Sequence, residues 1–169
     1  MPPSPSRPPR LERIVKVADW AAERGDAVLV TLGLGSCVAI MLHDAEACAG
    51  AMAHILLPSK SLARDATNPA KFPETAVPLL VERLTALGAE PRRLIAKLAG
   101  GASMFAQLMT PGSMQMGERN ILACRAVLRH VGIPLVREAV GGGAGRSVRF
   151  SVADGRVEIR SVGADATAL

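Results

Sequence analysis

The amino-acid sequence predicts one α+β domain, in which a layered, largely antiparallel β-sheet core is flanked by helices. Short apolar stretches bounded by glycine and other turn residues recur along the chain, which is typical of strands. Two longer segments, 74–87 and 116–130, instead carry apolar residues at helical spacing. Several strands follow one another through tight turns, and this favours hairpins over a parallel sheet with helical crossovers.

The two ends of the chain differ from the domain between them. Residues 1–12 contain five of the twelve prolines and almost no apolar side chains, so we expect a disordered, Pro-rich tail. The single domain is expected to span 13–163, and residues 164–169 are expected to be frayed. Its first strands are predicted over 14–17 and 27–32.

A β-hairpin and a second half rich in helix and strand follow. Asp44-Ala-Glu-Ala47 supplies turn residues between apolar strands over 37–43 and 48–57. Gly88 and Gly132 end the two helices, since glycine is favoured just past a helix C-terminus. Residues 104–115 hold three methionines and a Pro-Gly pair and are expected to form an irregular loop. The remaining strands are predicted at 92–98, 135–140, 147–152 and 156–162.

Composition narrows the class of protein. Apolar residues make up 49% of the chain and aromatic residues only 2%, so the core must consist mainly of aliphatic side chains and methionine. The formal net charge is +5, but the arginines are scattered and too few aromatic residues exist for base stacking. We therefore do not expect nucleic-acid binding, and an acidic protein surface is an equally good partner for a mildly basic one.

The sequence favours a cytoplasmic protein. No apolar run approaches the ~20 residues that span a bilayer, and the N-terminus is rich in Pro and Arg rather than similar to a signal peptide. We expect no direct membrane insertion. The chain has three cysteines, an odd number, which argues against a disulfide framework. Cys124 falls on the apolar stripe of the second predicted helix and is expected in the core.

Cys37 and His54 form the candidate reactive pair. If the hairpin turn is centred between Ala45 and Glu46, Cys37 lies opposite His54, with Cβ atoms about 5 Å apart. A thiol beside an imidazole can lose its proton to it and become a nucleophile. Taken singly, each residue is more often a core cysteine or a hydrogen-bonded histidine, so the pairing carries the hypothesis.

The same register places His43 opposite Cys48 at the turn. Positions 37 and 43 lie about 20 Å apart along a strand, so one zinc ion cannot bind both pairs. This argues against a zinc or redox protein, and we expect no metal and no cofactor. Cys37 follows Gly35 and Ser36, whose backbone N–H groups can point at one spot. We therefore interpret His43 and Cys48 as an exposed hairpin end.

The glycine clusters do not match phosphate-binding loops. Gly33-Leu-Gly35 lacks the third glycine of a dinucleotide fingerprint, and Gly141–Gly145 leads into a strand rather than a helix. Neither offers the helix N-terminus that binds phosphate. Both clusters are interpreted as turns.

Several motifs in order resemble the family of the chemoreceptor glutamine deamidase CheD. The resemblance covers roughly residues 14–162, and two of its motifs contain the candidate pair. The motifs are Thr31-Leu-Gly-Leu-Gly-Ser-Cys-Val-Ala39, Gly50-Ala-Met-Ala-His-Ile-Leu-Leu-Pro58, Lys71-Phe-Pro-Glu-Thr-Ala76, Lys97-Leu-Ala-Gly-Gly-Ala-Ser-Met-Phe105, Gly117-Glu-Arg-Asn-Ile121 and Gly145-Arg-Ser-Val-Arg-Phe150.

The resemblance implies a function and a site. The family's cysteine, histidine and threonine correspond to Cys37, His54 and Thr31, and the implied fold is similar to the catalytic domain of cytotoxic necrotizing factor toxins. The implied substrates are methyl-accepting chemotaxis receptors, with the phosphatase CheC as a further partner. A non-catalytic adaptor that binds receptors or CheC is the alternative, and the intact trio argues against it.

Two segments depart from the family pattern. Ala139-Val-Gly-Gly-Gly143 stands where relatives often have Asp-x-Gly-Gly-Asn, and Lys71-Phe-Pro-Glu74 stands where many have Lys-Tyr-x-Asp. Neither departure touches the trio. The sequence assigns no role to Glu118-Arg119-Asn120 beyond a first helical turn in which Glu118 complements the helix dipole.

Overall fold

The computed structural model describes residues 10–169 and contains two β-sheets and two helices packed in layers. The strands are β1 (Leu11–Ile14), β2 (Trp20–Arg24), β3 (Ala27–Leu34), β4 (Val38–Asp44), β5 (Ala49–Ile55), β6 (Ile95–Gly100), β7 (Leu135–Val140), β8 (Arg146–Ser151), β9 (Val157–Ser161) and β10 (Thr167–Ala168). The helices are α1 (Pro73–Ala86) and α2 (Met116–Val131), with 3₁₀ turns at Lys60–Leu62, Pro69–Lys71, Pro91–Arg93 and Ala106–Leu108.

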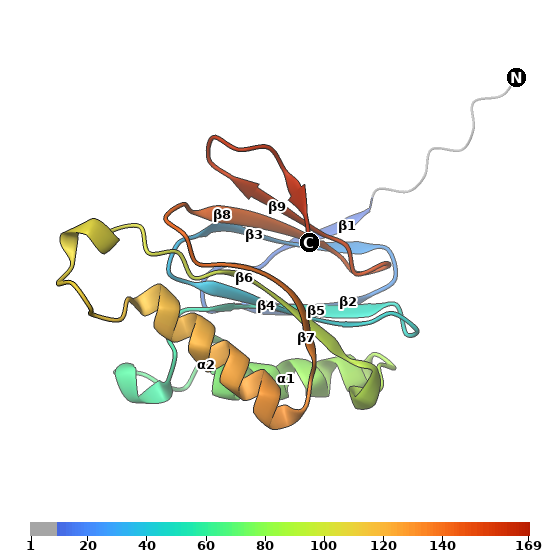
Figure 1. Ribbon diagram of the computed structural model, residues 1–169. Coiled ribbons are helices and arrows are strands. Elements are labelled where there is room, and N and C mark those ends of the chain that lie inside the picture. The colour runs from blue at the N-terminus through green and yellow to red at the C-terminus, as the bar shows by residue number, and fades with distance from the viewer. Residues whose placement is uncertain (1–9) are drawn as a thin grey trace, which may run out of the picture.

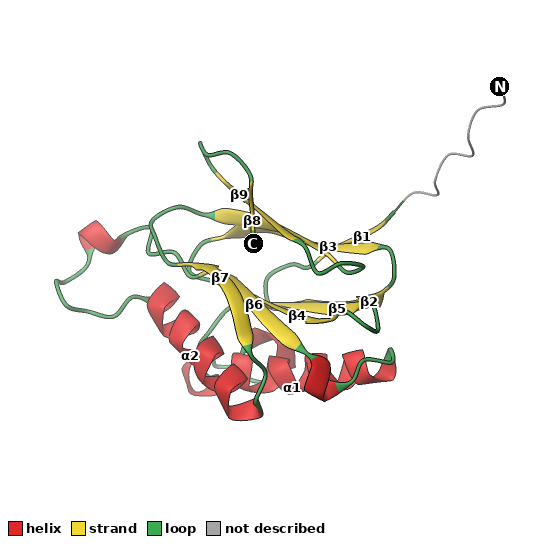
Figure 2. Ribbon diagram, turned by 45° about the vertical axis from the view of Figure 1, so that its right-hand side comes forward, coloured by secondary structure: helices red, strands yellow, loops and turns green. Residues whose placement is uncertain are grey.

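The two sheets stack face to face. Sheet I has the strand order β1-β3-β8-β9-β10, and sheet II has the order β2-β5-β4-β6-β7. The pairs β1–β3 and β6–β7 are parallel and the other pairs are antiparallel. Both helices lie against the outer face of sheet II, which leaves the outer face of sheet I without a helix (Figure 1). The turned view in Figure 2 shows the same three layers. The α+β, largely antiparallel fold predicted from the sequence is confirmed.

Each interlayer space contains a hydrophobic core. Between the sheets, Leu29, Met41, Met52 and Phe150 are almost fully buried. Between sheet II and the helices, aliphatic side chains dominate, and Cys124 lies among them with no exposed surface. Sheet II is therefore covered on both faces, which explains why every residue of β4 and β5 is buried.

The hairpin β4–β5 has a different register from the predicted one. Ala39, rather than Cys37, is the Cα partner of His54, and His43 pairs with Gly50. The turn comprises residues 45–48 because the buried Asp44 carboxylate accepts the N–H groups of Glu46 and Ala47 at 3.0 and 3.2 Å. The turn is thus centred one residue later than expected.

Several predicted boundaries also moved. The strand expected over 14–17 is Leu11–Ile14, so residues 11 and 12 belong to a strand rather than to the tail, and residues 1–9 lie outside the described residues. The strand expected over 92–98 is Ile95–Gly100. Residues 164–169 are not frayed throughout, because β10 pairs with β9 and Leu169 N–H donates to the Val157 carbonyl at 2.8 Å.

Within residues 10–169, no helix is long and apolar enough to cross a membrane. The structural likeness to the cytotoxic necrotizing factor domain, implied by the resemblance, stays a prediction.

Candidate active site

The predicted trio comes from both sheets: Thr31 contacts His54 between them, and Cys37 packs against the same interlayer core. Thr31 lies on β3 of sheet I, His54 on β5 of sheet II, and Cys37 immediately precedes β4. Thr31 and His54 are buried, whereas Cys37 is half-buried. Ala39, the strand partner of His54, lies two residues after Cys37. Because side chains alternate along a strand, Cys37 and His54 remain on the same face despite the corrected register.

Hydrogen bonds fix the tautomer of His54. The Thr31 hydroxyl donates its one hydrogen to the Val15 carbonyl at 2.7 Å, and its oxygen lies 2.8 Å from His54 Nδ1. Since that hydrogen is already used, the Thr31 oxygen must accept from His54 Nδ1–H. A neutral imidazole protonated at Nδ1 carries its lone pair on Nε2.

His54 Nε2 is the free end of this chain of hydrogen bonds. It is buried, and no residue of the described chain hydrogen-bonds to it. A buried polar atom without a partner is costly in a folded protein and calls for an explanation. Its lone pair, on the face it shares with Cys37, is suited to accept a proton from the thiol.

Burial shifts the pKa values of Cys37 and His54 in the directions that favour their neutral forms. Desolvation lowers the pKa of His54, against an opposing contribution from the Val15 carbonyl. Desolvation raises the pKa of the Cys37 thiol, against a smaller opposing contribution from its own backbone N–H. Desolvation therefore favours the neutral thiol and the neutral imidazole over a thiolate–imidazolium pair.

The turn that presents Cys37 is anchored by the segment following β6. Gly101 N–H donates to the Cys37 carbonyl and Ala102 N–H to the Gly35 carbonyl, each at 2.8 Å. Gly100 makes this close approach possible, because a Cβ built there would lie 2.3 Å from the Cys37 carbonyl oxygen. In the described part of the chain, neither the Ser36 nor the Cys37 N–H donates to another residue.

Arg146 supports the same region from sheet I, and sequence analysis did not identify it. Its guanidinium donates to the carbonyls of Gly100 at 3.0 Å and Ala139 at 2.7 Å, and also to that of Gly141. These carbonyls lie at the ends of β6 and β7, so Arg146 ties sheet I to the segment that holds the Cys37 turn. The Gly-Arg pair within the resemblance was the only signal for it.

Helix α2 also reaches the site through Asn120, which sequence analysis left without a role. Asn120 is fully buried, and its Nδ2 donates to the carbonyls of Ser36 at 2.9 Å and Leu56 at 3.2 Å. Its neighbour Glu118 closes a capping box with Gln115 at the start of the helix. The expected contribution of Glu118 to the helix start is therefore a hydrogen bond as well as a charge.

The interpretation of His43 as an exposed hairpin end was wrong. His43 is 5% exposed, its Nε2 lies 2.8 Å from the Val152 carbonyl, and its ring meets Phe150 edge-on at 5.9 Å. The shift in register separates His43 from Cys48, which ends the turn with a φ of 48° and is exposed. Across residues 10–169, no group of three His, Cys, Asp or Glu side chains is placed to hold a metal ion.

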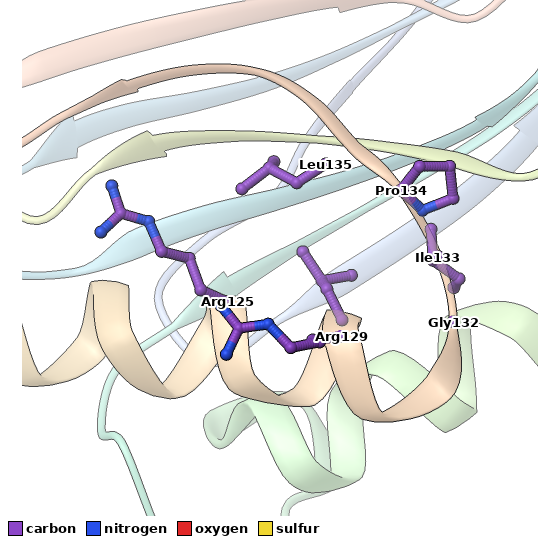
Figure 3. Close-up of a pocket in the computed structure, with 7 residues that line it drawn as sticks. Arg125, Arg129, Gly132, Ile133, Pro134 and Leu135 are labelled. Carbon is purple, nitrogen blue, oxygen red and sulfur yellow. The ribbon is translucent and has the colours of Figure 1, made fainter.

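Two cavities lie near the ends of α2. The one beside the candidate site has a volume of about 390 Å³ and is walled mainly by Ser36, Ala102, Met104, Phe105 and Met109. The other, at about 530 Å³, lies at the C-terminal end of the helix. There Arg125 and Arg129 project from α2, and Pro134 and Leu135 belong to the segment that follows (Figure 3). This second cavity is lined by no member of the trio.

Comparison with known proteins identifies similar chains. Residues 56–161 match the family model described as CheD chemotactic sensory transduction. A probable chemoreceptor glutamine deamidase CheD of Caldanaerobacter subterraneus subsp. tengcongensis is 42% identical over 88% of this chain and 92% of its own. The chemoreceptor glutamine deamidase CheD of Thermotoga maritima is 41% identical over 90% of this chain and 94% of its own.

A more distant likeness concerns the fold alone. The crystal structure of a Neisseria meningitidis protein of the DUF152 family superposes with a TM-score of 0.51 at 12% sequence identity. The match covers 79% of this chain and 65% of that chain.

Proposed function

The chain belongs to the CheD family, and we propose that it is a chemoreceptor glutamine deamidase in which Cys37 is the nucleophile. The observation that carries the cysteine-dependent mechanism is the unpartnered Nε2 of His54. The other ring nitrogen, Nδ1, is held by the Thr31 hydroxyl, whose hydrogen goes to the Val15 carbonyl, so the Nε2 lone pair is available to the thiol on the same face.

Acylation begins when Cys37 Sγ attacks the carbon of the glutamine side-chain amide. The thiol proton passes to His54 Nε2, and the amide oxygen becomes an oxyanion as the C–S bond forms. The imidazolium then returns the proton to the leaving nitrogen, the C–N bond breaks, and ammonia departs. A thioester between Cys37 and the substrate remains.

Deacylation uses the same groups in reverse order. His54 takes a proton from water as the water oxygen attacks the thioester, and the proton then goes to the departing Cys37 sulfur. The products are glutamate and the free thiol. The N–H groups of Ser36 and Cys37 hold the oxyanion in both steps, and a donor of this kind contributes roughly 3 kcal/mol to transition-state stabilisation.

Thr31 orients the imidazole in this scheme. Its oxygen accepts from His54 Nδ1–H and therefore keeps the lone pair on Nε2. A hydroxyl is neutral, so it stabilises the imidazolium less than a carboxylate does in the Ser-His-Asp arrangement. The main effect of Thr31 is then on the tautomer and the ring orientation.

The surface beside the site suits an amphipathic protein substrate. Phe105, Leu108 and Met114 are 68%, 83% and 56% exposed on the segment that borders the 390 Å³ cavity next to Ser36. Apolar side chains that flank the target glutamine on a receptor helix would pack here. The net charge of +5 favours an acidic partner. CheC, implied by the resemblance, remains a further predicted partner, and the expected cytoplasmic location fits this role.

Ammonia release tests the proposal. Purified receptor cytoplasmic fragment is mixed with the enzyme, ammonia is measured, and mass spectrometry follows the small mass increase from Gln to Glu. The wild-type chain and Cys48→Ala should release ammonia, whereas Cys37→Ala should release none, because the covalent route is lost. Receptor binding without ammonia from the wild type would support the adaptor alternative, and activity in Cys37→Ala would exclude the mechanism.

A further inference from the structure

Asn120 is a fully buried polar residue whose role the reaction scheme above does not explain. Both of its observed hydrogen bonds run from Nδ2 to backbone carbonyls, at Ser36 and at Leu56. Its Oδ1 is buried and has no hydrogen-bond partner in the described chain. A buried amide that served stability alone would have hydrogen-bond partners at both its oxygen and its nitrogen. Here only Nδ2 is paired, so we ask what its two hydrogen bonds accomplish.

The backbone around Cys37 gives the answer. In a trans peptide unit the C=O and N–H groups point in opposite directions. Three consecutive units of the turn have their carbonyls held: Gly35 by Ala102 N–H, Ser36 by Asn120 Nδ2, and Cys37 by Gly101 N–H. Only the middle unit is held by a side chain, and this unit carries the Cys37 N–H.

The direction of that N–H matches an oxyanion donor. Asn120 holds the Ser36 carbonyl directed toward α2, so the Cys37 N–H points the opposite way within the same peptide plane. The Cys37 N–H donates to no other residue of the described chain, and it belongs to the same residue as the sulfur. An oxyanion formed on the attacked carbon would lie near the same sulfur.

We infer that Asn120 is a positioning residue for acyl transfer, which fixes the Ser36–Cys37 peptide so that the Cys37 N–H receives the oxyanion. The inference rests on the proposed deamidase function and adds to it a residue that positions the oxyanion donor. The second bond, to Leu56, ties the turn to the end of the strand that carries His54. One uncharged nitrogen with two hydrogens thus links the nucleophile turn to the strand of its base.

The placement of α2 is rigid enough for this task. Gly117 packs so closely on the segment after β6 that a Cβ there would lie 2.5 Å from the Gly101 carbonyl oxygen. Cys124, one turn beyond Asn120 on the same helix face, is fully buried in the core and makes no contact with the turn through a hydrogen bond. It provides a matched control for the loss of a buried α2 side chain.

The test separates oxyanion positioning from thiol activation and from folding. Asn120→Ala and Asn120→Asp are made in a Cys48→Ser background, because Cys48 is exposed and would react with alkylating reagents. Asp keeps the shape of Asn but presents acceptors to the Ser36 and Leu56 carbonyls. Turnover on receptor fragment, the rate of Cys37 alkylation by iodoacetamide and the melting temperature are measured. Cys124→Ala is the control.

Alkylation at a saturated carbon forms no oxyanion, so it reports only the thiol and its base. Both Asn120 variants should lose about 10²-fold in kcat, as expected for a misplaced catalytic group, with KM little changed. Their alkylation rates and pH profiles should match the parent. Cys124→Ala should lower the melting temperature and keep kcat.

Parental kcat in a folded Asn120 variant would overturn the inference. A parallel fall in kcat and alkylation rate would also overturn it, because Asn120 would then hold the thiol–imidazole pair rather than the N–H. Loss of folding in both variants would show a structural residue and would overturn it as well. A wild-type chain that releases no ammonia would instead refute the proposed function, and the inference with it.

Discussion

His43 and His54 lie between the same two sheets, and they differ in what their nitrogens contact. Both are buried, at 5% and 1% exposure. His43 uses Nε2 to contact the Val152 carbonyl and packs its ring edge-on against Phe150. His54 uses Nδ1 to contact Thr31, and its Nε2 has no partner in the described chain.

This difference shows that burial alone does not identify a reactive histidine. One nitrogen of each ring is hydrogen-bonded, and what distinguishes the two rings is whether the other nitrogen is fully buried without a partner, as Nε2 of His54 is. The His54 site meets this condition and has a thiol on the same face, whereas the exposed Cys48 belongs to the turn and is not paired with His43.

The largest difference between the two histidines should appear when each imidazole is removed. His54→Ala should lower turnover by about 10²–10⁴-fold, the usual contribution of a general acid–base group. His43→Ala should keep kcat in the folded protein but lower stability by about 1–3 kcal/mol, because the buried Val152 carbonyl loses its partner. Ammonia release and denaturant unfolding measure the two effects. An inactive but folded His43→Ala would mean that the wrong histidine has been assigned.

Changing Thr31 tests whether the hydrogen bond on Nδ1 is what frees Nε2. Thr31→Val keeps the shape but removes the oxygen that accepts from His54, and kcat should fall about tenfold or more. Tenfold corresponds to about 1.4 kcal/mol, which is the size of one net hydrogen bond. Thr31→Ser should recover much of the rate.

Thermal melts control for folding of the Thr31 variants. Equal rates for Thr31→Val and the wild type would show that Thr31 only packs against the ring and that another group fixes the imidazole.

The pH dependence of kcat/KM sharpens the comparison further. Protonated His54 cannot accept the thiol proton, so activity should be lost as pH falls through its pKa. Desolvation lowers that pKa below the ordinary value of 6.5, so activity should persist through pH 6.5 and fall only at more acidic pH. Initial rates of ammonia release across this range measure the effect. An acidic limb centred above 6.5 would contradict the assigned environment of His54.

The smallest expected effect is at Cys48. Its side chain is exposed at the hairpin turn, and Cys48 is the strand partner of neither histidine. Cys48→Ala should leave turnover and melting temperature unchanged, and alkylation of the remaining fast-reacting thiol should then report Cys37 alone. Any substantial loss of turnover would place the turn in the functional surface.

The sequence placed Cys37 and His54 on the same face of the hairpin, although the predicted register was wrong. The hairpin register was wrong by two positions, and two is the period of a strand, so Cys37 and His54 stayed on one face. An error of one residue would have put them on opposite faces. The helices were predicted within a residue or so of their observed bounds, because amphipathic spacing and terminal glycine are local signals.

The supporting residues could not be predicted in the same way. Arg146 and Asn120 act through backbone carbonyls that lie far away in sequence, and nothing local in the chain says which carbonyls they will meet. The division of the strands into two stacked sheets is likewise a property of long-range packing. The buried position of His43 followed from that packing and was missed with it.

The Val15 carbonyl has a consequence for how the site can change by mutation. It is a main-chain group, held in place where Val15 N–H donates to the Val30 carbonyl at 2.7 Å, and it receives the Thr31 hydrogen. Replacing the Val15 side chain leaves that oxygen present, so no single codon change at position 15 deletes the acceptor. The tautomer of His54 therefore depends on the path of the backbone at Val15. Apart from His54 itself, Thr31 is the one side chain of this hydrogen-bond chain whose substitution would change that tautomer directly.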